Sequence, residues 1–239
     1  KEDDYYNEDL LYKTFGVNAE LLIDHAWGYE PCTMKDIKAY KPEHTSIGTG
    51  QVLSSPYSFH KAKIVVKEMV DALALDLVDK NLLTDQISIT IGYDRENLSM
   101  YHGEVAMDRY GRKIPKHAHG TVRFKRHTSS SKLMQEALME WYEKHVDPIL
   151  TIRRINMSAN QVISEQEFKS RATYQQIDIF TDNQKLLKQD EDLEKEKRLQ
   201  QATLEIKKKY GKNAVLKALD LQTGATAKER NGMIGGHKA

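Results

Sequence analysis

The sequence predicts an α+β fold of the ferredoxin-like, split β-α-β kind, with a four-stranded antiparallel sheet and two helices on one face. Three observations lead to it. Residues 60–80 carry apolar side chains at three- and four-residue steps, which is typical of an amphipathic helix. Residues 86–93 alternate between apolar and polar, as a half-buried strand requires. The same two patterns recur further along the chain in mirrored order.

The first half of this domain, which we place at residues 41–170, has three expected elements. Ser46 to Leu53 contains two glycines among its apolar residues and favours an edge or bulged strand. His60 to Lys80 follows as the amphipathic helix. In Gln86 to Tyr93 the isoleucines fall on one side and the small polar residues on the other. A long polar connection then runs to about His119.

The second half mirrors the first. Thr121 to Lys125 alternates again, with Val122 and Phe124 on the apolar side. Ser129 to Ser131 supply N-cap candidates for a helix that Asp147-Pro148 ends. Ile149 to Met157 is the expected last strand. The order strand, helix, strand, strand, helix, strand gives the predicted topology.

Three further segments flank the domain. Residues 1–40 favour two short helices joined by a tight turn at Phe15 to Asn18. Residues 171–183 form a linker. Residues 184–239 begin with a highly charged helix to Tyr210 and end in a glycine-containing stretch that we expect to be loop or disorder.

Composition narrows the function classes. The chain has one cysteine, Cys32, so an intrachain disulfide and a thiolate zinc cluster are excluded. It has no apolar run long enough to cross a bilayer, and we expect it to act in the cytoplasm without contacting a membrane. The net charge is only +1, yet the stretch from Arg109 to Lys132 contains eight basic residues and no acidic one. That stretch is a candidate contact for a polyanion.

Alternation places the basic side chains of this region on the face of the sheet that the helices leave open. A sheet with one solvated, basic face can lie along a nucleic-acid backbone, where it contacts phosphates whatever the base sequence. The predicted contacts are Thr121, Arg123 and Lys125 on one strand, Arg126 at its end, and Arg153 on the last strand.

Three segments resemble the Y-family translesion DNA polymerases of the bacterial polymerase IV and V type (ImpB/MucB/SamB). Leu11-Tyr12-Lys13-Thr14-Phe15-Gly16-Val17, with the later His25-Ala26-Trp27-Gly28-Tyr29, is similar to the end of the family's thumb domain. His44-Thr45-Ser46-Ile47-Gly48 is similar to the entry of its little-finger domain, and Ile152-Arg153-Arg154-Ile155-Asn156-Met157-Ser158 to that domain's last strand. Asn156 and Arg154 depart from the family pattern, which has glycine and an apolar residue there.

The resemblance implies a DNA-gripping part of an error-prone polymerase that takes part in DNA damage bypass. It adds Ser46, and the backbone near Gly16 and Asn18 at a helix start, to the predicted DNA contacts. The carboxylates that hold two magnesium ions belong to the family's palm domain, whose motifs we do not find, so we expect no catalytic residue, no cofactor and no activity from this chain by itself. Glu165 and Glu167 are expected to be solvated.

One peptide resembles the sliding-clamp-binding motif that this family carries after the little finger. It consists of Gln176, Ile177, Asp178, Ile179 and Phe180. An extended peptide of this kind can insert its last two apolar side chains into a pocket on the clamp. The expected partners are therefore a DNA template-primer and the bacterial sliding clamp, with a further replication or repair partner open for the tail.

Two other readings remain open. The chain can be a catalytically silent adaptor that recruits the clamp. It can also be a ferredoxin-like RNA-binding module, which stacks bases on exposed aromatic residues of its central strands. Tyr93 and Phe124 are the aromatics on the two clearest strands, and alternation puts both on the core side. Four histidines near the basic stretch lack ligands at convincing spacing for a metal site.

Overall fold

The structure is a computed structural model that describes residues 8–40, 46–108, 110–171, 183–234 and 237–238. The chain divides into two units, Lys1–His44 and Thr45–Ala239, which are described separately. Of the described residues, no helix is long and apolar enough to cross a membrane.

The described residues of unit 1 form three helices: α1 (Glu8–Phe15), α2 (Asn18–Ala26) and α3 (Met34–Ala39). The two expected helices and the turn between them are confirmed. Gly16 makes that turn with a φ of 58°, a left-handed conformation that glycine adopts without steric cost. The third helix was not predicted; Thr33 and Asp36 begin it with a reciprocal capping box.

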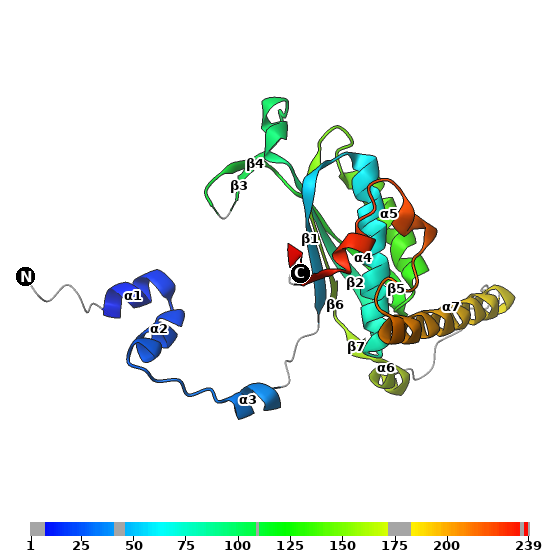
Figure 1. Cartoon of the computed structure of the whole chain (residues 1–239), viewed down its shortest axis with the longest axis horizontal. Coiled ribbons are helices and arrows are strands. Elements are labelled where there is room, and N and C mark those ends of the chain that lie inside the picture. The colour runs from blue at the N-terminus through cyan, green and yellow to red at the C-terminus, as the bar shows by residue number, and fades with distance from the viewer. Residues whose placement is uncertain (1–7, 41–45, 109, 172–182, 235–236, 239) are drawn as a thin grey trace, which may run out of the picture. The chain divides into compact units, whose positions relative to one another are not determined.

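Unit 2 is built on an antiparallel sheet (Figure 1). Its long strands are β1 (Ile47–Tyr57), β2 (Leu82–Tyr93), β5 (Ala118–Thr128) and β6 (Ile152–Asn160), in the spatial order β1-β6-β2-β5. A short fifth strand, β7 (Ile163–Ser164), pairs with the start of β2. The predicted α+β class and the antiparallel sheet are confirmed.

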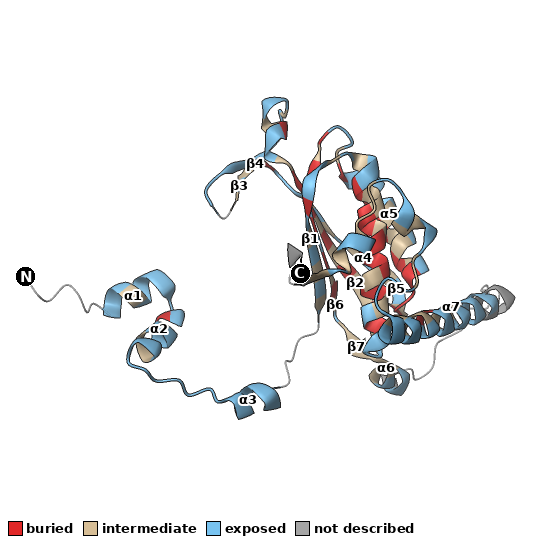
Figure 2. Cartoon of the chain, viewed as in Figure 1, coloured by how far each residue is buried: buried red, intermediate tan, exposed pale blue. Residues whose placement is uncertain are grey.

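Helices α4 (Phe59–Asp79) and α5 (Ser131–His145) pack on one face of this sheet (Figure 1). The isoleucines of β2 and the apolar stripes of both helices form one core, with Leu73, Ile89 and Leu138 almost fully buried (Figure 2). The order of strands and helices agrees with the prediction. In a ferredoxin-like sheet the first and third of the four strands, counted along the chain, are the central ones. Here the second and fourth, β2 and β6, are central, so the ferredoxin-like strand order that the sequence predicted is not the one observed.

The C-terminal part of unit 2 packs against the helix layer of the sheet domain. It comprises α6 (Glu165–Arg171), α7 (Asn183–Tyr210), the 3-10 turn η3 (Ala218–Leu221), α8 (Ala227–Arg230) and the short strands β8 (Met233–Ile234) and β9 (His237–Lys238). The stretch expected to be loop or disorder is instead attached to α4. The backbone N–H groups of Thr226 and Ala227 donate to the carboxylate of buried Glu68, at 2.8 and 3.1 Å.

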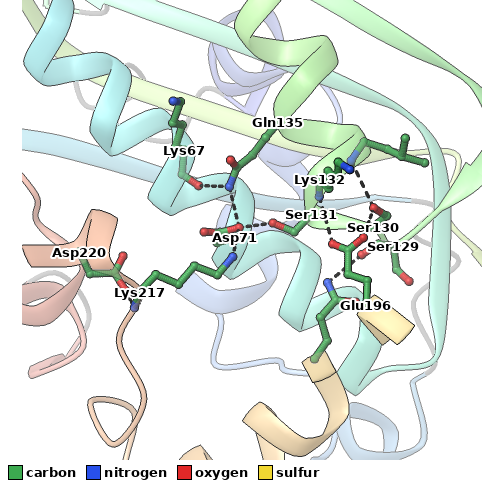
Figure 3. A network of polar contacts seen from close by, with 12 residues as sticks. Lys67, Asp71, Ser129, Ser130, Ser131, Lys132, Gln135, Glu196, Lys217 and Asp220 are labelled. Carbon is green, nitrogen blue, oxygen red and sulfur yellow. Dashed lines mark hydrogen bonds and ion pairs between the residues drawn. The ribbon is translucent and has the colours of Figure 1, made fainter. Parts of the chain in front are cut away.

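A second set of polar contacts ties α7 and the following segment to the helix layer (Figure 3). Glu196 of α7 accepts a 3.1 Å hydrogen bond from the backbone N–H of Lys132, in the first turn of α5. Asp71 of α4 accepts from Gln135 and pairs with Lys217 at 2.8 Å. An anionic side chain at a helix N-terminus accepts hydrogen bonds from free N–H groups there and is attracted to the positive end of the helix dipole.

The connection between β2 and β5 is also ordered into elements. It holds the 3-10 helix η2 (Arg95–Ser99) and a small hairpin of β3 (Val105–Met107) and β4 (Lys113–Pro115). Buried Asn97 attaches η2 to the sheet because its side chain donates to the carbonyl of Thr151 and accepts from the N–H of the same residue. Figure 1 shows β3 and β4 standing off the sheet on the side opposite α4 and α5.

Candidate nucleic-acid interface

The face of the sheet opposite α4 and α5 is called the open face below. Strand pairing and alternation with the buried residues define its members. Its centre is made of small and polar side chains, and its basic residues lie on β5 and β6. The members are Gly48, Gly50 and Val52 of β1; Arg154, Asn156, Ser158 and Asn160 of β6; Gln86, Ser88, Thr90 and Gly92 of β2; and His117, His119, Thr121, Arg123 and Lys125 of β5 and the residue before it.

The charge of the open face is of one sign. It carries the cations Arg123, Lys125 and Arg154, and none of its members is an Asp or a Glu. Within the described part of the chain, none of these three cations forms an ion pair. A cation whose charge is not balanced by a neighbouring carboxylate attracts polyanions more strongly than a paired one. The face therefore has the electrostatic character of a phosphate-binding surface.

The cations stand at two separate places along the face. Arg123 lies opposite Gln86 of β2, and Arg154 lies opposite Gly92 of the same strand. Six residues of extended strand span about 20 Å. That is more than half of a turn of B-form DNA, which is roughly 34 Å long.

Hydrogen bonds fix the polar side chains between the cations. The hydroxyl groups of Ser88 and Thr121 lie 2.9 Å apart, and the side-chain amide of Asn160 donates to the Ser88 hydroxyl at 2.7 Å. On the same face the Thr90 hydroxyl and Nδ1 of His119 are 2.7 Å apart. Side chains held this way lose less conformational entropy when a ligand orders them.

His117 lies beside Arg154 on the open face. An added Cβ atom at Gly92 would lie 3.2 Å from the Cβ of Arg154 and 3.5 Å from Nδ1 of His117, so all three residues share one place. Burial lowers the pKa of His117, and the positive charge of Arg154 lowers it further. An anion bound there would oppose both effects and favour the protonated ring.

Several predicted contact residues lie where we expected them. Thr121, Arg123 and Lys125 are exposed and alternate with Val122 and Phe124, which pack against the core. Ser46 is exposed directly before β1. In unit 1, Gly16 forms the turn and Asn18 begins α2. Whether these residues contact DNA stays a prediction.

Arg153 lies at an irregularity in the pairing of β6 with β2, and its contact with DNA stays a prediction. Ile152 and Ile155 are both buried, and the pairing register shifts so that Tyr93 lies opposite Ile152 but Gly92 opposite Arg154. Arg153 is therefore the extra residue of a β-bulge. Its Nε lies 3.9 Å from the carboxylate of Asp94. Arg154 lies opposite Gly92 on the open face and was not among the predicted contacts.

Arg126 is also engaged within the molecule. Its guanidinium pairs with Asp190 of α7 at 2.7 Å, and both side chains remain about half exposed. Such exposed pairs are worth less than about 1 kcal/mol, so the contact is readily exchanged for another anion. The peptide Gln176, Ile177, Asp178, Ile179 and Phe180 lies outside the described residues.

The aromatic residues of the central strands do not reach the open face. Tyr93 is buried and its hydroxyl accepts from the backbone N–H of Asp147, while Phe124 packs against the core. RNA-binding modules of this kind stack bases on exposed strand aromatics. The arrangement of β2 and β5 thus does not favour the RNA-binding reading.

Two other candidate features of the sequence were a histidine metal site and the carboxylates near residue 165. Across the described ranges, no three His, Cys, Asp or Glu side chains are grouped closely enough to hold a metal ion. We expected Glu165 to be solvated, and this prediction is wrong. Its side chain is 14% exposed and pairs with Lys197 of α7 at 2.6 Å. Its role in the structure is to join α6 to α7.

The chain is similar to a known protein of Bacillus subtilis. The chain is 24% identical over 234 residues to the Bacillus subtilis (strain 168) protein named "Putative UV-damage repair protein UvrX". The chain is a distant homologue of that protein. The alignment covers 97% of this chain and 47% of UvrX, so the chain spans about half the length of the curated relative it matches. No protein-family model matches the chain.

Proposed function

We propose that this chain is the DNA-gripping part of a Y-family translesion polymerase and that the open face holds the backbone of a template-primer duplex. The observation that carries the proposal is a sheet face with three unpaired cations and no carboxylate, on β5 and β6. Distant homology to a protein named for UV-damage repair supports it. Contacts of this kind sense charge and shape rather than sequence, which suits a protein that moves over any template.

The parts of the chain have separate roles in this proposal. Unit 2 corresponds to the family's little finger and unit 1 to the end of its thumb. The nucleotidyl transfer itself belongs to a palm domain with its magnesium ions, and we assign no catalytic residue here. The peptide from Gln176 to Phe180 binds the bacterial sliding clamp.

The decisive test is a salt titration of duplex DNA binding. Each phosphate contact contributes about one unit to the slope of log K against log salt. Changing Arg123 and Lys125 together to alanine should reduce that slope by about two, and Arg154→Ala by about one more. Lys195 and Arg198 are exposed on α7. Their double alanine variant removes the same charge and should leave the slope unchanged. A slope that does not respond to the open-face changes would refute the interface.

The clamp contact is tested separately. Purified sliding clamp should be retained by the immobilised chain and lost with Phe180→Ala, because the aromatic ring is the main anchor of such a peptide. Equal retention by both proteins would exclude clamp binding through this peptide and leave the DNA interface untouched. A chain that binds clamp but not DNA would instead be the adaptor.

A further inference from the structure

The β3–β4 hairpin carries exposed apolar and basic side chains close together in the chain. Figure 1 shows its two strands on the side of the sheet opposite α4 and α5. Its residues Met107 and Tyr110 are 62% and 64% exposed. Arg112 lies over the Tyr110 ring, with its guanidinium carbon 4.9 Å from the ring centre. The adjacent Lys113 is exposed and forms no ion pair with any described residue.

One carboxylate, that of Asp108, joins the described residues Tyr110 and Arg112 of this hairpin. Asp108 accepts hydrogen bonds from the backbone N–H groups of Tyr110 and Arg112, each at 2.9 Å. Its second oxygen accepts from Nε and Nη2 of Arg112 at 2.8 and 2.7 Å. The Arg112 side chain and these backbone bonds lower the pKa of Asp108 to about 2. The aromatic ring and the guanidinium are thus positioned before any ligand arrives.

The base of the hairpin is fixed as well. The backbone N–H of Lys116 donates to the carbonyl of Glu104 at 2.9 Å, and their side chains pair at 2.6 Å. The anchoring of η2 through Asn97 connects the hairpin to the start of β6. A ligand that lies on the open face near Arg154 and His117 would therefore meet a preformed projection at that end.

We propose that the hairpin binds unpaired bases of a DNA strand that continues beyond the duplex on the open face. This inference rests on the proposed function. Proteins that hold single strands combine basic residues for the backbone with aromatic side chains on which bases stack. The members of the open face include three cations but no Phe, Tyr or Trp, whereas the hairpin supplies Tyr110, backed by Arg112. An apolar protein partner fits less well, because Lys113, which forms no ion pair with any described residue, lies among the exposed apolar side chains.

The test compares two DNA substrates, a blunt duplex and the same duplex with a single-stranded 5′ template overhang. Tyr110→Ala should weaken binding of the overhang substrate by roughly 5- to 150-fold, the range that one stacked base gives. Binding of the blunt duplex should stay unchanged. Tyr110→Phe keeps the ring and should restore overhang binding. A 2-aminopurine placed in the overhang should change its fluorescence with the wild-type chain and not with Tyr110→Ala.

The chain offers a matched control. Tyr210 on α7 is 68% exposed and has the ammonium of Lys209 5.2 Å from its ring centre, which reproduces the environment of Tyr110 away from the hairpin. Tyr210→Ala should leave both substrates bound as before. The hairpin proposal is overturned if Tyr110→Ala has no effect, if it weakens both substrates equally, or if Tyr210→Ala has the same effect. Failure of the open face would appear on the blunt duplex instead, as an unchanged salt slope in the Arg123 and Lys125 variant.

Discussion

The two units of this chain hold their structure in different ways. Unit 2 buries a continuous core between its sheet and its helices, whereas Ala19 is the one buried apolar residue that the structure describes in unit 1 (Figure 2). Unit 1 leaves Leu21, Trp27 and Ile37 at least half exposed. Its helices are defined by local features, such as the Gly16 turn and the Thr33 cap. Helices of this length are marginal in water unless an apolar face is packed.

This difference indicates which unit can hold surface side chains in fixed positions. A DNA-binding surface needs side chains held in fixed positions, and the open face has them because a buried core lies directly behind it. Unit 1 has the local signals for helices but not the burial that would fix them. The main part of the proposed DNA interface therefore lies on unit 2, and we expect unit 1 to depend on contacts outside itself for stability.

The largest expected effect tests this difference directly. Leu138 is fully buried in unit 2, while Leu21 in unit 1 is 53% exposed. Leu138→Ala should lower the free energy of unfolding by about 2–5 kcal/mol through lost burial and the cavity left behind. Leu21→Ala should change it by less than about 0.5 kcal/mol. Urea denaturation followed by circular dichroism measures both, and similar losses would show that unit 1 has a core of its own.

A second, smaller effect tests how α7 is attached to the rest of unit 2. Glu196 of α7 accepts from the Lys132 backbone N–H, and Glu191 on the same helix is exposed. Glu196→Ala should lower the free energy of unfolding of unit 2 by about 0.5–2 kcal/mol, because it removes a helix cap. Glu191→Ala serves as the matched control and should have almost no effect. Equal effects would mean that α7 is held to the sheet domain by something other than this contact.

Much of unit 2 could be predicted from the sequence because its signals are periodic and local. The alternation in β2 and the apolar stripe of α4 follow directly from burial on one face. The bulge at Arg153 could not be predicted in the same way, since a single inserted residue leaves the composition of the strand unchanged and moves only its register.

The attachment of the C-terminal segment is the other feature that local patterns do not indicate. Thr226 and Glu68 are 158 positions apart in sequence, and their contact depends on how α4 is placed in the folded chain. The segment around Gly224 has no apolar period of its own, which made loop or disorder the natural prediction. The β3–β4 hairpin could not be predicted from local patterns either. Its turn has no apolar period and depends on the hydrogen bonds that Asp108 accepts.

The smallest effect separates the two units by pH. In unit 2 the pKa of His117 is lowered by burial and by Arg154, so the unfolded chain takes up a proton at this ring before the folded one does. Unit 2 should therefore lose stability as the pH falls below the ordinary histidine pKa of about 6.5. In unit 1 the pKa of Glu30 is lowered by the Cys32 backbone N–H and by His25, so its contribution is lost only below the ordinary carboxyl range.

Between about pH 6.5 and 5, then, the contribution of His117 should change, while the Glu30 carboxyl stays mainly ionised. His117 is only partly desolvated and remains exposed to water, so solvent screening limits the expected loss of stability to a few tenths of a kcal/mol. The measurement is the difference in unfolding free energy between the wild-type chain and His117→Gln across this range, which removes the contribution of the other histidines. The affinity for DNA should depend on pH in the opposite direction from stability. A phosphate beside Arg154 favours the protonated His117 ring, so the affinity should rise as the pH falls. If His117→Gln shows the same rise in affinity as the wild type, the phosphate does not lie at this end of the open face.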